Sequence, residues 1–295
     1  MKEHSVNPTL KTTYRKQQTL QKEVSFLGIG IHTGKEVTMK FKPAKEGSGI
    51  LFKRTDLPGS PQIPATVEYV CDTLRSTTIG IRDVRVHTVE HVLAALYANN
   101  IDNLIIEVSA IEPPIGNGSS DIFVDMIDKA GIALQDATLP VVELHRPIYW
   151  CDKDIQIVAL PSDEYRISYT LHYPGSKVLS SQFHSSAITP EIFKSEIAPC
   201  RTFSLYEEVT MLMDRGLIKG GSLDNCVIIR DDVVFSKNGL FFQNEMCRHK
   251  ILDIVGDLSL IGFKFLAHII AIRSGHGSNY EFAKKFYNYI TREHC

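Results

Sequence analysis

Alternating apolar and polar residues from Val24 onward are typical of half-buried β-strands. The segments VSFLGIGIHTG, EVTMKFKPA and GILFKR follow one another and are separated by turns rich in glycine and proline. A further strand is expected at residues 77–81. Residues 88–99 have apolar side chains at helical spacing instead, namely Val89, Val92, Leu93 and Leu96. The pattern therefore predicts a group of strands followed by a helix.

The same order of elements occurs twice along the chain. A helix that contains His91 precedes a strand at residues 103–108, a Gly-Asn-Gly-Ser turn and a helix at residues 121–130. A helix that contains His249 likewise precedes the strand AHIIAI, a Gly-His-Gly-Ser turn and a last helix. We therefore predict an α+β fold of two similar domains. Each is a β-sheet with helices on one face, and the helices pack between the sheets.

Changes in residue pattern suggest where these domains begin and end. Residues 1–20 are polar and are expected to be a loose N-terminal segment. The first domain is expected at residues 21–135, with a small β insertion near residues 45–70. The second is expected at residues 136–295. An apolar insertion near residues 204–229 contains two methionines, which suit either ordinary core packing or an adaptable apolar wall.

Composition narrows the class of protein. The 295 residues include 32 basic and 34 acidic side chains, which give a net charge of −2 and no positive field to attract nucleic acid. The longest apolar stretch contains Lys264 and His268 and is too short for a transmembrane helix, which needs about 20 residues. The N-terminus lacks the apolar core of a signal peptide, and no two of the six cysteines form a C-x-x-C pair. We expect a cytoplasmic protein without a transmembrane segment.

Histidines and carboxylates one helical turn apart are candidate metal ligands. His87 and His91 have the i, i+4 spacing of a chelating pair, and Glu90 lies beside them as a candidate base. His249 and Asp253 repeat this spacing on the second helix. Two histidines and one carboxylate leave a fourth tetrahedral position for water in catalytic zinc sites, but they also ligate Fe(II) in oxygenases. Read separately, the same residues could be half-buried polar side chains or an intrahelical His–Asp pair.

The segment SGHGS places His276 between two glycines, which permit close approach of the backbone to a ligand. Asp257 is expected to bind one ring nitrogen of His276 and to keep the imidazole protonated. A charged imidazolium could then protonate a leaving amine, whereas a surface turn histidine is the simpler alternative. The corresponding turn in the first half has Asn117 in place of the histidine.

Seven segments in one order resemble a known family. GIGIHTG, TVEH, IDNLIIEV, GNGSS, RTF, HKILDIVGDL and SGH are similar to the UDP-3-O-acyl-N-acetylglucosamine deacetylases, zinc enzymes of lipid A biosynthesis. The resemblance covers residues 17–289. It implies hydrolysis of the N-acetyl group of a UDP-linked, acylated amino sugar, which gives the free amine and acetate. It also implies that the apolar insertion forms a passage for the fatty acyl chain.

Roles for individual residues follow from the resemblance. It implies that Zn²⁺ is bound by His91, His249 and Asp253. Glu90 then matches the general base of the family. His87 stands where the family usually has a small polar residue, so the resemblance does not support the ligand that spacing alone suggests.

Five further residues match positions of the family's active site. His276 corresponds to the general acid or charge stabiliser, and Asp257 to the residue that orients it. Thr202 corresponds to a hydroxyl that holds the oxyanion, Lys250 to a substrate contact and Phe203 to an aromatic wall of the cleft. The residues alone leave two alternatives open: a metal amidohydrolase acting on another N-acyl sugar, and a duplicated, non-catalytic binding module. They also leave open whether His32 contacts the site.

Overall fold

The first of two large β-sheets is built from strands in the first half of the chain. The computed structural model describes residues 6–7, 10–214 and 216–291. Five strands pair in the order β2-β3-β9-β4-β5. They are β2 (Val24–Ile29), β3 (Glu36–Pro43), β4 (Ile50–Arg54), β5 (Gln62–Pro64) and β9 (Leu104–Val108).

The second large sheet has seven strands. β1, β10, β18, β12 and β11 follow one another across it, and β13 pairs with both β18 and β14. Their bounds are β1 (Lys11–Leu20), β10 (Ile132–Glu143), β11 (Ile148–Asp152), β12 (Ile155–Leu160), β13 (Tyr165–Leu171), β14 (Gln182–Ala187) and β18 (Lys264–Ile272). Every second residue of β18 is buried, because one face of this sheet packs on helices.

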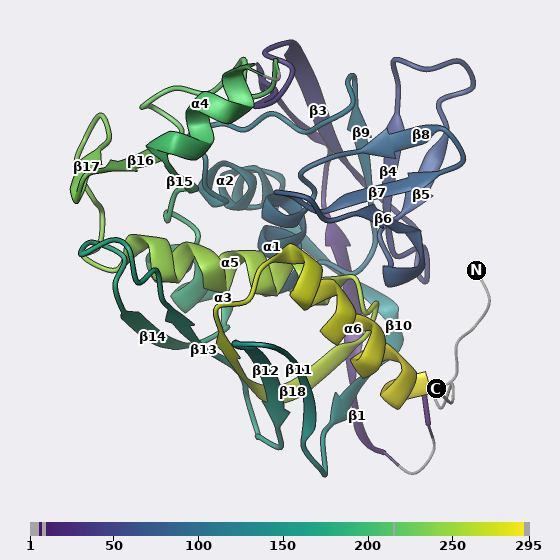
Figure 1. Ribbon diagram of the computed structural model, residues 1–295. Helices are drawn as coiled ribbons and strands as arrows, with labels where there is room; N and C mark the ends of the chain where they lie inside the picture. The colour runs from purple at the N-terminus through teal and green to yellow at the C-terminus, as the bar shows by residue number, and fades with distance from the viewer. Residues whose placement is uncertain (1–5, 8–9, 215, 292–295) are drawn as a thin grey trace.

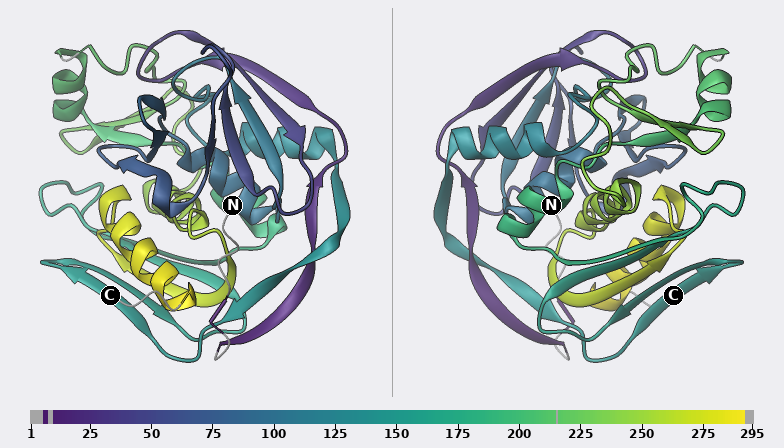
Figure 2. Two further views of the ribbon diagram at one scale, coloured as in Figure 1. Left: turned by 90° about the vertical axis from the view of Figure 1, so that its right-hand side faces the viewer. Right: turned by 90° about the vertical axis from the view of Figure 1, so that its left-hand side faces the viewer.

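Four helices lie between the two sheets (Figure 1 and Figure 2). They are α1 (Glu90–Ala98), α2 (Asp121–Ala130), α5 (Glu245–Ser259) and α6 (His276–Thr291). α2 contacts β2, α5 contacts β13 and β14, α6 contacts β11 and β12, and α1 packs against both α2 and α5. The predicted α+β class, with helices between two sheets, is confirmed.

Smaller elements surround this layered core. One three-stranded sheet consists of β6 (Val70–Asp72), β7 (Thr78–Ile81) and β8 (Val84–Val86). Another consists of β15 (Phe203–Leu205), β16 (Val227–Arg230) and β17 (Val233–Phe235), and α4 (Tyr206–Asp214) packs beside it. Short helical turns complete the fold at η1 (Val67–Tyr69), α3 (Pro190–Ile192) and η2 (Phe193–Ile197).

The expectation of a loose N-terminal segment is wrong for residues 11–20. These residues form β1, which pairs antiparallel with β10 along most of its length. β1 lies at the edge of the sheet, and most of its side chains stay at least partly exposed. A mostly polar edge strand carries no apolar alternation, so its pattern did not reveal it. Residues 1–5 and 8–9 lie outside the described part of the chain.

Two other sequence-based expectations differ from the structure. The expected boundary between residues 135 and 136 falls inside β10, a continuous strand. The expected insertion near residues 45–70 contributes β4 and β5 to the first large sheet, where β4 pairs in parallel with β9. Because β4 has a buried partner strand, it belongs to the core of the sheet. The division of the chain into two domains at that boundary stays a prediction.

A glycine permits unusually close contact between α1 and α5. A Cβ atom at Gly256 would lie 2.1 Å from the carbonyl oxygen of Glu90, at the first residue of α1. Only a residue without a side chain fits there, so Gly256 sets how near the two helices approach. This contact brings the start of α1 beside the middle of α5.

We expect Gly256→Ala to destabilise the fold by about 1–3 kcal/mol, because the added methyl group overpacks the helix contact. In an unobstructed helix the same substitution would increase stability by about 0.5–1 kcal/mol. Urea unfolding followed by circular dichroism measures the sign directly. A variant as stable as the wild type would contradict the tight contact.

Candidate active site

Three candidate metal ligands meet where α1 faces α5. His91 lies in the first turn of α1, while His249 and Asp253 lie one turn apart on α5. Oδ1 of Asp253 is 3.4 Å from Nε2 of His249 and 3.9 Å from Nε2 of His91. One ligand atom from each of the three residues lies within 4.8 Å of the others, and all three side chains are buried. Side chains distant in sequence thus converge on one small volume.

The chemistry of this triad suits a divalent cation. Burial and the nearby His249 lower the pKa of His91 to about 3, so its ring is neutral and able to bind a metal. Burial would raise the pKa of Asp253, but the charges of Lys250 and His276 hold it well below its usual value. Oδ1 of Asp253 is buried and has no hydrogen-bond partner among the described residues. A buried, ionised oxygen that faces two neutral imidazoles fits a cation that fills the remaining space.

A backbone carbonyl orients one of these histidines. Nδ1 of His249 lies 2.9 Å from the carbonyl oxygen of Cys200. A proton on Nδ1 would donate to this carbonyl and leave Nε2 free to face Asp253. The site therefore contains residue types that ligate metals, and the carbonyl of Cys200 orients one of them.

Glu90 precedes His91 and is almost fully buried. Its Oε2 accepts a hydrogen bond of 2.9 Å from the backbone N–H of Thr77. Burial raises the pKa of Glu90 to about 7; the charge of His276 opposes this rise, whereas the two aspartates of α5 add to it. A carboxylate with such a pKa is able to accept and release a proton near neutral pH.

His276 begins α6, rather than lying in a turn before it as expected. Its Nδ1 lies 2.9 Å from Oδ2 of Asp257, which also accepts a hydrogen bond from the side chain of Asn279. The other oxygen of Asp257 accepts one from the hydroxyl of Thr77. Burial lowers the pKa of His276, but Asp257 and Asp253 outweigh it and raise the pKa to about 9. The imidazole is thus held in its charged form at neutral pH.

Lys250 and Phe203 lie beside the triad. The amine of Lys250 donates to Oδ2 of Asp253 at 2.9 Å and lies 5.6 Å from the centre of the Phe203 ring. The same ring stands edge to face with His249, at 6.5 Å between ring centres. Thr202, which precedes Phe203 in the sequence, is partly exposed. Together with the triad, these residues line one cavity.

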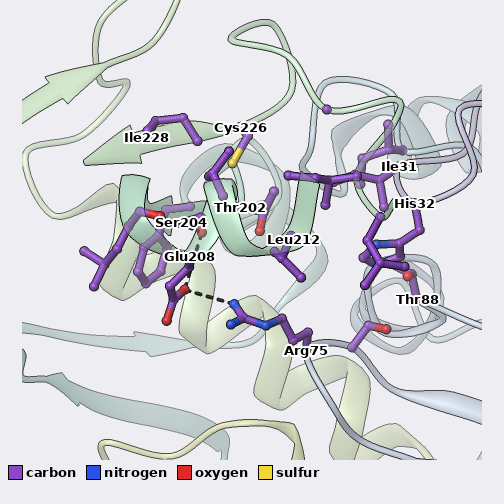
Figure 3. A pocket seen from close by; sticks show the side chains of 18 of the residues that line it. Ile31, His32, Arg75, Thr88, Thr202, Ser204, Glu208, Leu212, Cys226 and Ile228 are labelled. Carbon is purple, nitrogen blue, oxygen red and sulfur yellow. Dashed lines mark hydrogen bonds and ion pairs between the residues drawn. The ribbon is translucent and has the colours of Figure 1, made fainter. Parts of the chain in front are cut away.

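That cavity has a volume of about 630 Å³, and its lining runs from the triad to the segment around α4. Apolar side chains from α4 and the segment after it line its far part; they include Val209, Leu212, Leu217 and Ile218. An ion pair joins Arg75 to Glu208 at 3.0 Å between pocket-lining side chains (Figure 3). The cavity therefore has a polar end with the candidate ligands and an apolar arm.

Comparison with known proteins agrees with this arrangement. Residues 17–288 match the family model described as UDP-3-O-acyl N-acetylglycosamine deacetylase. The chain belongs to this family. The UDP-3-O-acyl-N-acetylglucosamine deacetylase of Chlamydia felis is 51% identical over 271 residues, which cover 92% of this chain and 96% of the relative. Its counterpart in Chlamydia pneumoniae is 50% identical over 272 residues, with the same coverage.

A third relative extends the comparison. The enzyme of the same name from Chlamydia trachomatis serovar L2 is 47% identical over 265 residues, which cover 90% of this chain and 92% of the relative. The resemblance inferred from seven short segments is thus confirmed over nearly the whole chain. Among the described residues, no helix is both long and apolar enough to cross a membrane.

His87 is not on the helix that carries His91. It precedes α1, and its Nδ1 lies 2.8 Å from the hydroxyl of Thr78. The backbone of Thr88 has a φ of 54°, which interrupts any helix between His87 and His91. The i, i+4 interpretation of these two histidines is therefore wrong, because the chain turns between them.

Other side chains have places that the sequence left open. His32 lines the cavity and therefore reaches the site. Asn117 binds the side chains of Ser119 and Asp121 at the start of α2. Thr77 and Arg75 were not predicted as site residues. Thr77 was expected only as the first residue of a strand, and the fold brings both side chains to the site.

We expect Asp257→Asn to lower the pKa of His276 from about 9. The variant removes the main negative charge that opposes burial, so the proton leaves at lower pH. NMR titration of the His276 ring in metal-free protein measures the change. An unchanged pKa would show that Asp257 does not hold this proton.

Proposed function

We propose that this protein is a zinc-dependent deacetylase that hydrolyses the N-acetyl group of UDP-3-O-acyl-N-acetylglucosamine in lipid A biosynthesis. The observation that carries the zinc site is the convergence of His91, His249 and Asp253 on one buried volume beside a cavity. The proposed substrate is supported by the names of relatives whose sequences are about 50% identical to this chain. A duplicated binding module would not need an ionised carboxylate facing two neutral imidazoles.

His91, His249 and Asp253 would hold Zn²⁺ through two nitrogens and one oxygen. When bound, zinc would act as a Lewis acid toward the acetamide carbonyl and lower the pKa of water. The three residues leave a further coordination position, as in catalytic rather than structural zinc sites.

Glu90 is the proposed general base. Glu90 directly precedes His91 of the triad, and its side chain is buried. Its Oε2 already accepts a hydrogen bond from the backbone N–H of Thr77. In its ionised form, Glu90 accepts the proton of the attacking water. A pKa of about 7 leaves a large share of the group ionised at neutral pH.

Thr202 is the proposed stabiliser of the oxyanion. Its partly exposed side chain lines the same cavity as the triad and carries a hydroxyl that is able to donate to a developing negative charge. Lys250 brings a positive charge to the same end of the cavity, and Phe203 contributes an apolar wall there.

His276 is the proposed general acid. Its imidazole enters the cavity from α6, and its Nε2 lies 4.0 Å from Oδ2 of Asp253. Because Asp257 holds the ring protonated, His276 donates a proton to the amine as the C–N bond breaks. The acetate then carries the oxygen that came from water.

The apolar arm is the proposed site of the 3-O-acyl chain. Its side chains offer an aliphatic surface continuous with the polar end where the acetamide would lie. Burial of methylene groups against this surface would contribute about 0.8 kcal/mol each.

We also propose a cytoplasmic location. Cys71, Cys151, Cys200, Cys226 and Cys247 all carry free thiols. Two of these thiols are exposed, which suits a compartment where thiols stay reduced.

We expect purified wild-type protein to bind about one zinc ion per chain and His91→Ala to lose it, since a three-residue site loses a third of its ligands. His87→Ala is the matched control, because His87 lies outside the triad and should leave the zinc content unchanged. Metal analysis by mass spectrometry after dialysis gives both values. Equal zinc loss in the two variants would contradict the assignment.

We expect turnover to rise with pH as Glu90 ionises and to fall at higher pH as His276 loses its proton, from pKa values of about 7 and about 9 in the metal-free protein. A bound cation would move both limbs to lower pH.

Glu90→Gln and His276→Gln should each lower kcat by about 10²-fold or more. Glu90→Gln should also remove the acidic limb of the pH profile, and His276→Gln the alkaline limb. Near-normal turnover in a variant that retains zinc would rule out that role.

A further inference from the structure

A buried carboxylate lies beneath the loop that joins β2 to β3. The side chain of Glu112 is only 1% exposed. It accepts hydrogen bonds from the backbone N–H groups of His32, at 3.2 Å, and Thr33, at 2.8 Å. The hydroxyl of Thr33 donates a third bond at 2.8 Å. One carboxylate therefore satisfies several donors of a loop that would otherwise lack partners.

This loop holds a segment from the other half of the chain. The backbone N–H of Gly220 donates to the carbonyl of Ile31 at 3.0 Å, and that of Lys219 donates to the carbonyl of His32 at 3.3 Å. Ile31 and His32 on one side, and Ile218 and Lys219 on the other, line the cavity. The hydrogen-bonded pair of segments is thus a wall of the cavity, next to its apolar arm.

The contacts in this wall leave no space for adjustment. A Cβ atom at Gly30 would lie 2.4 Å from Oε1 of Glu112. A Cβ atom at Gly220 would lie 2.3 Å from the carbonyl oxygen of Gly30. The carboxylate, the loop and the opposite segment are therefore stacked in direct contact, so a displacement of the first must displace the others.

We propose that Glu112 is a positioning residue that fixes this wall and thereby sets how well the apolar arm accommodates a long acyl chain. Charge-assisted hydrogen bonds to backbone donors hold the loop more firmly than neutral ones would. The loop then holds residues 218–221 in place. This inference rests on the proposed function, because it takes the acyl chain as the occupant of the arm.

Glu112 acts at a distance from the reacting atoms. It does not line the cavity and is not part of the triad, so its loss should change the binding of the chain and leave the chemical step intact. General destabilisation of the fold would instead affect every substrate alike. Acyl-chain length is therefore the variable that separates the two roles.

The test compares Gly30→Ala, Glu112→Ala and the double variant on UDP-N-acetylglucosamine that carries either a long 3-O-acyl chain or a 3-O-acetyl group. Gly30 has no left-handed backbone conformation, so its added methyl group acts through the clash with Glu112. We expect each single variant to lower kcat/KM for the long-chain substrate about tenfold, through KM, as about two methylene groups lose buried contacts. The 3-O-acetyl substrate should change less than twofold.

The double variant gives the sharpest result. Glu112→Ala removes the atoms with which the methyl group at position 30 would collide, so the double variant should be no worse than Glu112→Ala alone. Gly175→Ala is the matched control, since nothing lies within 4 Å of a Cβ atom there. Additive effects, or equal losses on both substrates, would overturn the proposal. If Glu112→Ala fails to fold, Gly30→Ala still tests the dependence on chain length.

Amide hydrogen exchange tests the wall without any assay of activity. In Gly30→Ala the amides of Thr33 and Gly220 should both exchange faster than in the wild type, whereas Gly175→Ala should leave them unchanged. Faster exchange at Thr33 alone would show that the loop does not hold the opposite segment. Wild-type protein without deacetylase turnover would refute the proposed function, and the exchange result would still decide whether Glu112 orders this wall.

Discussion

The close contact between α1 and α5 at Gly256 is the constraint on which the rest of the site depends. Gly256 lets the carbonyl oxygen of Glu90 approach where any side chain would collide. That approach brings the first turn of α1, with Glu90 and His91, beside the ligands on α5. The two large sheets cover the outer sides of these helices and hold them in contact. The candidate metal site shared by the two halves of the chain is thus a consequence of helix packing.

Within this buried volume, neighbours decide the charge on each group. Burial makes the ring of His91 neutral, whereas Asp257 keeps His276 protonated a short distance away. Asp253 stays ionised because the charged groups of Lys250 and His276 lie near it. The site therefore holds a neutral ligand, an anionic ligand and a cationic acid together. These differences let residues of similar type take different parts in one reaction.

The wall held by Glu112, next to the apolar arm of the cavity, likewise depends on a buried charged group and its neighbours. A charged group with several backbone donors orders a loop that has no regular structure of its own. That loop in turn pairs with a segment from the insertion around α4. The candidate metal site and the shape of the apolar arm both depend on contacts between parts of the chain that are far apart in sequence.

The sequence by itself determined the elements with strong periodicity, among them the helix at Asp121–Ala130 and the spacing of His249 and Asp253 along one helix face. It did not reveal β1, because a polar edge strand needs only a partner for its backbone and no apolar face. Spacing also suggested His87 as a ligand, and the left-handed backbone of Thr88 removes it from the helix. The distances between these side chains and the shifts of their pKa values were decided by tertiary structure, because burial and the distance between charges exist only once the two halves pack together.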